Sequence, residues 1–170
     1  MIKQEERRVE PILRAEKLTK RFGELTANRE IDIEIHAGEI HAIAGENGAG
    51  KSTLMKMLYG VYQPTAGNLY IDGEKMERWN PTIAREKGIG MVFQDFRLVP
   101  AFTVLENVFL SLHSAGWKIN KKKLRDEINR ISAEYRLSVN PDTEVWKLDL
   151  GQRQHVEILS LIHISEPTRR

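Results

Sequence analysis

The fold of this chain is decided by residues 45–52, which read Gly45-Glu46-Asn47-Gly48-Ala49-Gly50-Lys51-Ser52. They fit the pattern G-x-x-x-x-G-K-[ST], in which glycines let backbone N–H groups face phosphate oxygens closely. The start of a following helix adds partial positive charge, Lys51 supplies a mobile ammonium, and Ser52 offers a hydroxyl ligand for magnesium. A chance match in a chain of ordinary composition has a probability on the order of 0.5%. The stretch therefore predicts a phosphate-binding loop.

The flanks of this loop predict the strand and the helix that the motif requires. The small apolar run at residues 40–44 is bounded by glycines and predicts a strand. The spacing of Leu54, Met55 and Leu58 predicts a helix over residues 51–59, and Gly60 is placed to end it as a C-terminal cap. The order strand, loop, helix is the context in which the motif binds nucleotide.

Further short elements are predicted around this unit. Ile31, Ile33 and Ile35 alternate with polar residues, which indicates a half-buried strand. The other expected elements are a strand at 68–72 with a hairpin turn at Asp72-Gly73, a helix from Asn80-Pro81 to Gly88, and a strand at 89–93.

After Gln94 the pattern becomes helical. Thr103 and Glu106 have the spacing of a capping box, and an apolar face follows as far as Gly116. A second helix is indicated by Leu124, Ile128, Ile131 and Tyr135 on one face, and a turn follows at residues 140–142. Residues 95–147 are therefore predicted to form a helical subregion.

Composition excludes several classes of function. The chain has 170 residues and no cysteine, so it holds no disulfide and no cysteine-based metal or nucleophile site. Its 26 basic and 24 acidic residues leave a formal charge of +2, which does not indicate a nucleic-acid partner. It has neither an apolar run of about 20 residues nor a signal peptide, so we expect a cytosolic domain whose membrane contact comes through a partner. Residues 1–10, mostly charged, are expected to be a flexible N-terminus.

Residues 12–158 resemble the ATP-binding subunits of ABC transporters, and within these the ATPases of sugar and nucleoside importers. The resemblance is densest at GEIHA (38–42), at the phosphate loop with the following STLM, at GIGMVFQ (88–94) and at GQRQHVEI (151–158). Many nucleotide-hydrolysing enzymes share the loop alone. Its combination with the other segments, in this order, indicates the family.

The resemblance implies roles for individual residues. ATP would contact the loop from Gly45 through Ser52 together with Thr53, and Phe22 matches the aromatic residue that stacks on adenine. Phe22 could instead be an ordinary core residue, an alternative that the sequence leaves open. Lys51 and Gln94 match the catalytic positions. Ser52 and Gln94 match the magnesium contacts, with Gln94 also touching the attacking water and sensing the membrane partner.

Residues 148–152 match the family signature, which reaches the γ-phosphate of ATP held by a second subunit. Asp149, Gly151 and Gln152 occupy the contacting positions. The usual second residue is serine, so Asp149 places a carboxylate where a hydroxyl would meet phosphate oxygens. Gly151 and the start of a following helix are expected to keep an end that favours anions.

The implied fold is an α/β P-loop NTPase of the ABC ATPase type, with an antiparallel β subregion and a helical subregion, incomplete at its C-terminal end. The implied function is ATP binding and hydrolysis that powers solute import, with ATP and Mg²⁺ as cofactors. The expected partners are transmembrane permease subunits, a second nucleotide-binding domain and, indirectly, a solute-binding protein, at the cytoplasmic face of the membrane. Two alternatives stay open: a soluble ABC-type protein of translation or DNA repair, and a nucleotide-binding fragment without turnover.

The end of the chain departs from the family. The expected aspartate for magnesium and glutamate for water are missing at a plausible spacing, and Ser165-Glu166-Pro167-Thr168 follows Gly151 too closely to replace them. Residues 159–169 resemble the translation of a transposase adapter from sequencing libraries. We therefore interpret residues 11–158 as an incomplete nucleotide-binding domain and 159–170 as a non-native tail, with a degenerate magnesium site as the alternative. Such a chain is expected to bind ATP without efficient hydrolysis.

Overall fold

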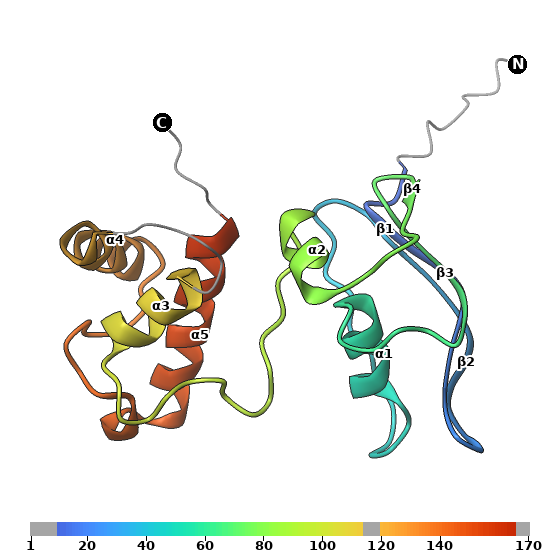
Figure 1. The fold of residues 1–170 in the computed structure, drawn as a ribbon, viewed down its shortest axis with the longest axis horizontal. Coiled ribbons are helices and arrows are strands. Elements are labelled where there is room, and N and C mark those ends of the chain that lie inside the picture. Colours follow the sequence, from blue (N-terminus) through green and yellow to red (C-terminus); the bar gives the residue numbers. More distant parts are fainter. Residues whose placement is uncertain (1–9, 114–119, 166–170) are drawn as a thin grey trace, which may run out of the picture. The chain divides into compact units, whose positions relative to one another are not determined.

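The computed structural model describes residues 10–113 and 120–165, and the chain divides into two compact units between residues 89 and 90. The first unit contains β1 (Leu13–Phe22), β2 (Leu25–Ile35), α1 (Lys51–Leu58), β3 (Ala66–Ile71), β4 (Glu74–Lys75) and α2 (Pro81–Glu86). The second contains α3 (Val104–His113), α4 (Lys121–Glu134), the 3-10 turn η1 (Val145–Lys147) and α5 (Leu150–Ser165), as labelled in Figure 1. The flexible N-terminus predicted for residues 1–10 lies almost wholly outside the described residues.

The sheet of the first unit has the order β2-β1-β3-β4, and all neighbouring strands are antiparallel. Leu13 of β1 pairs with Ile35 on one side and with Ile71 on the other. The predicted alternation at residues 31–35 is confirmed, since these isoleucines are half-buried and the residues between them are exposed. The predicted antiparallel β subregion is therefore present.

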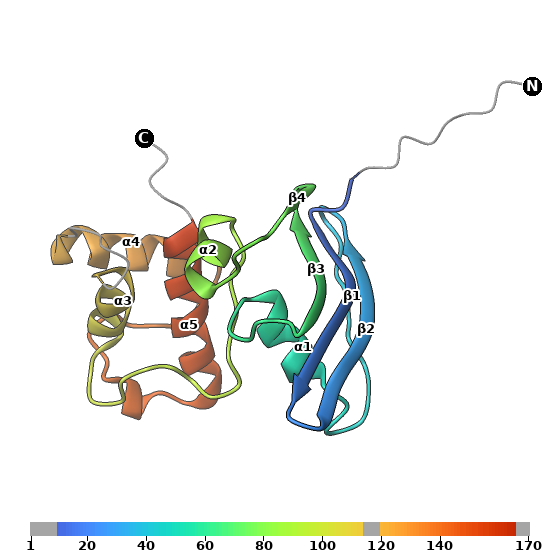
Figure 2. The same ribbon diagram turned by 45° about the vertical axis from the view of Figure 1, so that its right-hand side comes forward.

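Helix α1 lies beside this sheet, as Figure 2 shows. Its buried residues are Leu54, Met57 and Leu58, and the Trp79 indole donates from Nε1 to the Leu58 carbonyl at 3.0 Å. The predicted end of the helix is confirmed: Gly60 has φ +85° and donates its N–H to the Met57 carbonyl.

The predicted turn and cap of this unit are also confirmed. Asp72 and Gly73 both have positive φ, as a two-residue hairpin turn requires, and they join β3 to β4. The Asn80 side chain accepts hydrogen bonds from the Thr82 and Ile83 N–H groups and so caps α2.

Two predicted strands are not formed. Residues 40–44 and 89–93 have no regular secondary structure, and Ile40 is 99% exposed. A strand exists only as a hydrogen-bonded neighbour of another strand, and no described segment pairs with either stretch. The phosphate loop thus follows an unpaired segment rather than the predicted strand.

The helical subregion is confirmed as the second unit, and it extends further than predicted because α5 belongs to it. Its core comprises Val104, Leu105, Val108, Leu112, Leu124, Ile128, Ile131, Val145, Leu148, Val156 and Leu159. The predicted capping box is present, since the Thr103 hydroxyl accepts from the Glu106 N–H and the Glu106 carboxylate accepts from the Thr103 N–H. Placing Tyr135 on the buried face was wrong: the helix ends at Glu134, and Tyr135 is 49% exposed.

Helix α5 runs through the boundary predicted between residues 158 and 159. Leu159 is buried, and the Ser160 hydroxyl donates to the Val156 carbonyl at 3.0 Å. Residues 166–170 lie outside the described part, so the non-native tail stays a prediction. At 16 residues α5 is the longest described helix, and none of these helices is long and apolar enough to cross a bilayer.

Asn107 fixes the loop that precedes α3 within the second unit. Its Oδ1 accepts from the Val99 N–H at 2.7 Å, and its Nδ2 donates to the Val99 carbonyl at 3.1 Å. Only 3% of Asn107 is exposed. Replacing it leaves buried backbone groups without partners, which is costly.

We therefore expect Asn107→Ala to lower the free energy of unfolding by about 1–3 kcal/mol. The measurement is the midpoint of urea unfolding followed by helical circular dichroism. Asn129→Ala is the control, because Asn129 is exposed on α4 and its loss should cost at most about 0.5 kcal/mol. Equal midpoints for the two variants would contradict the role given to Asn107.

Candidate functional site

The phosphate loop is held against β2 by a contact that only glycine allows. At Gly50, φ is +85°, and an added Cβ would lie 2.3 Å from the Ala27 carbonyl oxygen. Asn28 donates from Nδ2 to the Gly50 carbonyl at 3.3 Å, which fastens the end of the loop to the strand. Gly48 also has φ +85°, so the turn before α1 uses glycine twice.

The Lys51 side chain folds back onto the first residues of the loop. Its ammonium donates to the carbonyls of Gly45 at 2.6 Å and Glu46 at 2.7 Å. A second loop bond runs from the Ala49 N–H to the Glu46 carbonyl. The ammonium therefore already lies over the concave backbone turn where the sequence predicts phosphate.

The N-terminus of α1 lacks a side-chain cap. The residue at its N-cap is Gly50, no side chain accepts from its first N–H groups, and its first turn has no acidic residue. By contrast, side chains of Asn80, Thr103, Asn120 and Asp149 accept from the first turns of α2 to α5. The backbone donors of α1 and its positive dipole end are thus available to an anion.

The remaining predicted loop residues surround this end. Glu46, Asn47, Ala49 and Ser52 are exposed or nearly so, and Thr53 is half-buried in the first turn. Of these, Ser52 places a hydroxyl in the first turn, where a phosphate-bound magnesium ion could use it. Among the described residues no three His, Asp or Glu side chains group as a metal site.

Phe22 is not a core residue. It ends β1, pairs with Leu25 across the hairpin and is 43% exposed. In the same register Lys20 pairs with Asn28, the residue that bonds to Gly50. The end of the hairpin therefore lies beside the phosphate loop, as a base-stacking role for Phe22 would need.

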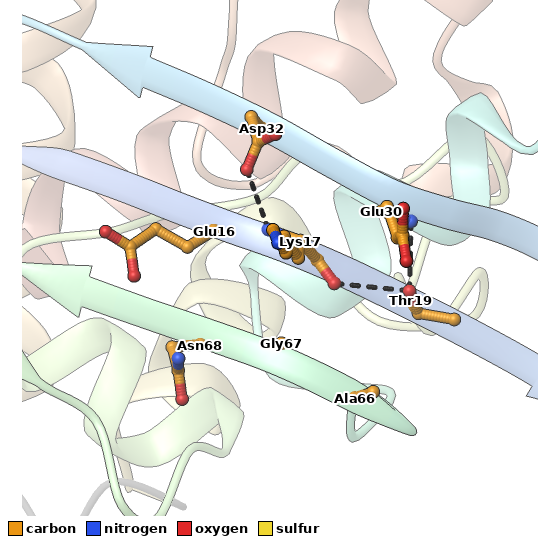
Figure 3. A pocket seen from close by; sticks show the side chains of 8 residues that line it. All are labelled: Glu16, Lys17, Thr19, Glu30, Asp32, Ala66, Gly67 and Asn68. Carbon is orange, nitrogen blue, oxygen red and sulfur yellow. Dashed lines mark hydrogen bonds between the residues drawn. The ribbon is translucent and has the colours of Figure 1, made fainter.

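A depression lies elsewhere, on the sheet, and none of the predicted site residues lines it. It has a volume of about 510 Å³ and lies where β1 bulges between β2 and β3, as Figure 3 shows. Lys17, with φ +47°, donates its N–H to Asp32, while the Thr19 hydroxyl accepts from the Glu30 N–H. The carboxylates of Glu16, Glu30 and Asp32 line it, so it is unsuited to bind phosphate.

Gln94 belongs to the second unit and is exposed in the irregular segment before α3. Sequence reasoning missed what holds this segment: the Glu157 carboxylate of α5 accepts from the Arg97 N–H at 2.8 Å. The Arg97 guanidinium lies 3.7 Å from the centroid of the Phe93 ring. The hydrogen bond between Arg97 and Glu157 joins residues 60 positions apart in the chain, so no local sequence pattern could predict it.

The signature residues form a capping box at the start of α5. The Asp149 carboxylate accepts from the Gln152 N–H at 2.8 Å, and the Gln152 side-chain oxygen accepts from the Asp149 N–H at 3.1 Å. Gly151 follows the first residue of the helix and is exposed. The expected anion-favouring end is thus already occupied by the chain's own carboxylate.

We expect Asp149→Ala to lower the free energy of unfolding by about 1 kcal/mol, because a helix loses its N-cap. Asp149→Ser should restore most of this loss, since a serine hydroxyl can accept the same N–H. Urea unfolding measures both variants, with Asp126→Ala, in the exposed middle of α4, as the control. A serine variant as unstable as the alanine variant would show that the cap does not contribute.

Comparison with known proteins gives one consistent result. Residues 28–167 match the ABC transporter family. The chain is 42% identical over 155 residues to the nucleoside import ATP-binding protein NupA of Lactococcus lactis, covering 91% of this chain and 31% of that protein. It is 40% identical over 157 residues to the ribose import ATP-binding protein RbsA 3 of Rubrobacter xylanophilus, covering 92% and 32%.

A solved structure agrees with these relatives. The dimeric ATP-binding cassette MJ0796, bound to ADP and inorganic phosphate, is matched with a TM-score of 0.73 at 28% identity, over 88% of this chain and 68% of that one. The chain spans about a third of the length of the two curated relatives. With its phosphate loop, antiparallel sheet and helical unit, this chain belongs to the ATP-binding proteins of ABC transporters.

Proposed function

We propose that this chain binds magnesium-ATP at its phosphate loop and forms part of the ATPase that drives an ABC importer of sugars or nucleosides. The observation that carries the proposal is the uncapped N-terminus of α1 behind the glycine turn, with the Lys51 ammonium over that turn. The two curated relatives, named for nucleoside and ribose import, support the class of solute.

The loop fits the phosphates of a nucleotide. Its concave turn depends on Gly50, where a side chain has no room, and the first turn of α1 offers backbone donors without a competing carboxylate. On binding, the Lys51 ammonium would exchange its two carbonyl partners for phosphate oxygens, which are stronger acceptors. Phe22 would stack on the base from the end of β1.

Magnesium would be held by the Ser52 hydroxyl together with phosphate oxygens and water, because Mg²⁺ keeps several waters and takes few protein ligands. Bound magnesium-ATP would supply the γ-phosphoryl group whose transfer to water powers transport. Gln94 would orient that water and sense a permease subunit. Asp149, Gly151 and Gln152 would face ATP held by a second cassette, an arrangement supported by the dimeric form of MJ0796.

The importer assignment has its own test. A chain of this class should be recovered from membranes with a permease when the genes that neighbour its own are co-expressed. A soluble ABC-type protein of translation or DNA repair would instead be recovered with ribosomes or DNA and leave the permease behind.

We expect Lys51→Ala to abolish measurable magnesium-ATP binding, because backbone donors cannot replace a cation beside the β- and γ-phosphates. Isothermal titration calorimetry on the full 170-residue chain measures the affinity. Lys75→Ala is the control, an exposed lysine on β4 of the same unit, and it should leave binding unchanged. Equal affinity in Lys51→Ala and the parent would refute the proposed site.

We further expect the chain to bind ATP without hydrolysing it at an appreciable rate. Among the 170 residues, no aspartate follows Asp149 to serve as a further magnesium ligand, and no glutamate follows at the spacing needed to polarise the water. Release of inorganic phosphate from magnesium-ATP should not exceed that of Lys51→Ala. Robust magnesium-dependent release that Lys51→Ala removes would disprove the deficiency while supporting the site.

A further inference from the structure

We propose that Tyr62 is a positioning residue for the nucleotide base, which holds the Phe22 ring in the orientation in which a base stacks on it. The inference deepens the proposed function and rests on it, since it adds a fixed base platform to the phosphate loop. Four residues make up this aromatic cluster, namely Lys20, Phe22, Lys56 and Tyr62.

The two rings meet edge to face. Their centroids are 5.3 Å apart and their planes are inclined at 78°, which is a favourable geometry for an aromatic pair. The Lys20 ammonium lies 5.1 Å from the Phe22 centroid and 5.7 Å from that of Tyr62. Phe22 still keeps 43% of its surface exposed, so its contacts restrain the ring without covering it.

Tyr62 is itself fixed to the helix that begins at the phosphate loop. Its N–H donates to the Lys56 carbonyl at 3.1 Å, so it is anchored on the last turn of α1. The Lys56 ammonium also lies 5.5 Å from the centroid of the Tyr62 ring. An eight-residue helix is about 12 Å long, so Tyr62 is tied to the loop through a short rigid element.

The chain after Tyr62 is also fastened to β1. The Lys20 ammonium donates to the Gln63 carbonyl at 2.7 Å, the Thr65 N–H donates to the Thr19 carbonyl at 2.7 Å, and the Arg21 N–H donates to the Thr65 hydroxyl at 3.1 Å. These bonds hold the backbone segments that carry Phe22 and Tyr62 next to each other.

The aromatic cluster lies next to the loop rather than at a remote edge. Lys20 pairs across the sheet with Asn28, and Asn28 donates to the Gly50 carbonyl. Paired strands lie about 5 Å apart, so one strand spacing separates the cluster from the residue that holds the loop. Its two ammonium groups add positive charge on this side of the loop, which favours an anionic ligand.

A purely structural role for Tyr62 predicts a different behaviour. If the Phe22–Tyr62 pair only stabilised the hairpin, its loss would lower the affinity for every ligand of the loop alike. If it orients Phe22 for a base, its loss should weaken nucleotides and spare a ligand that has phosphates but no base. Inorganic tripolyphosphate with magnesium is such a ligand.

The experiment measures the affinities of the full chain for magnesium-ATP and magnesium-tripolyphosphate by calorimetry. Phe22→Ala should weaken ATP roughly 5- to 150-fold, the loss of one stacked base. Tyr62→Ala should weaken ATP roughly 2- to 10-fold, the loss of one aromatic pair, and Tyr62→Phe should restore it. All three variants should bind tripolyphosphate as the parent does.

The double variant separates positioning from direct contact. If Tyr62 acts through Phe22, then Phe22→Ala with Tyr62→Ala should bind ATP no more weakly than Phe22→Ala alone. Tyr70→Ala is the matched control, because Tyr70 on β3 is also a tyrosine in contact with a cation, Arg14, at 4.3 Å. Tyr70→Ala should leave the affinities for ATP and for tripolyphosphate unchanged.

Three results would overturn the inference. Additive losses in the double variant would mean that Tyr62 contacts the ligand itself, and an equal loss for tripolyphosphate would mean a structural role. Parent affinities that are equal for ATP and tripolyphosphate would mean that no base is bound, while leaving the phosphate site intact. A parent that binds neither ligand would instead refute the proposed function.

Discussion

The close approach of Gly50 to β2 is the constraint on which the candidate site depends. A hydrogen in place of a side chain lets the backbone reach the Ala27 carbonyl, and Asn28 then holds it there. Gly50 also occupies the N-cap of α1, where a glycine has no side chain that could accept from the first N–H groups. One small residue therefore both seats the loop on the sheet and leaves the helix end open to an anion.

The features that sequence reasoning predicted correctly depend on residues within a few positions of one another. The hairpin turn at Asp72-Gly73, the Asn80 cap and the Thr103-Glu106 capping box each need only adjacent residues or one helical turn. These turns and caps are determined by local backbone chemistry and do not depend on contacts with distant parts of the chain. The loop itself was predictable for the same reason, since its donors and its ammonium come from eight consecutive residues.

The structural features that were predicted wrongly, or not predicted, depend on residues far apart in the chain. Residues 40–44 and 89–93 have the composition of strands, yet a strand needs a neighbour that no described segment provides. The bond from Arg97 to Glu157 and the pairing of Phe22 with Tyr62 each join residues tens of positions apart. An isolated phenylalanine in a sequence cannot reveal whether its ring is packed in a core or held at the surface.

Helices α1 and α5 use the same backbone chemistry in opposite ways. At α1 a glycine leaves the N–H donors open, whereas at α5 the Asp149 carboxylate accepts from the Gln152 N–H. A phosphate that approached α5 would have to displace this carboxylate and would also meet its negative charge, whereas a serine cap would have to be displaced but would add no charge repulsion. If α5 does face a nucleotide, its contact is weaker than the family pattern implies. Most of the affinity for phosphate must then come from the loop at α1.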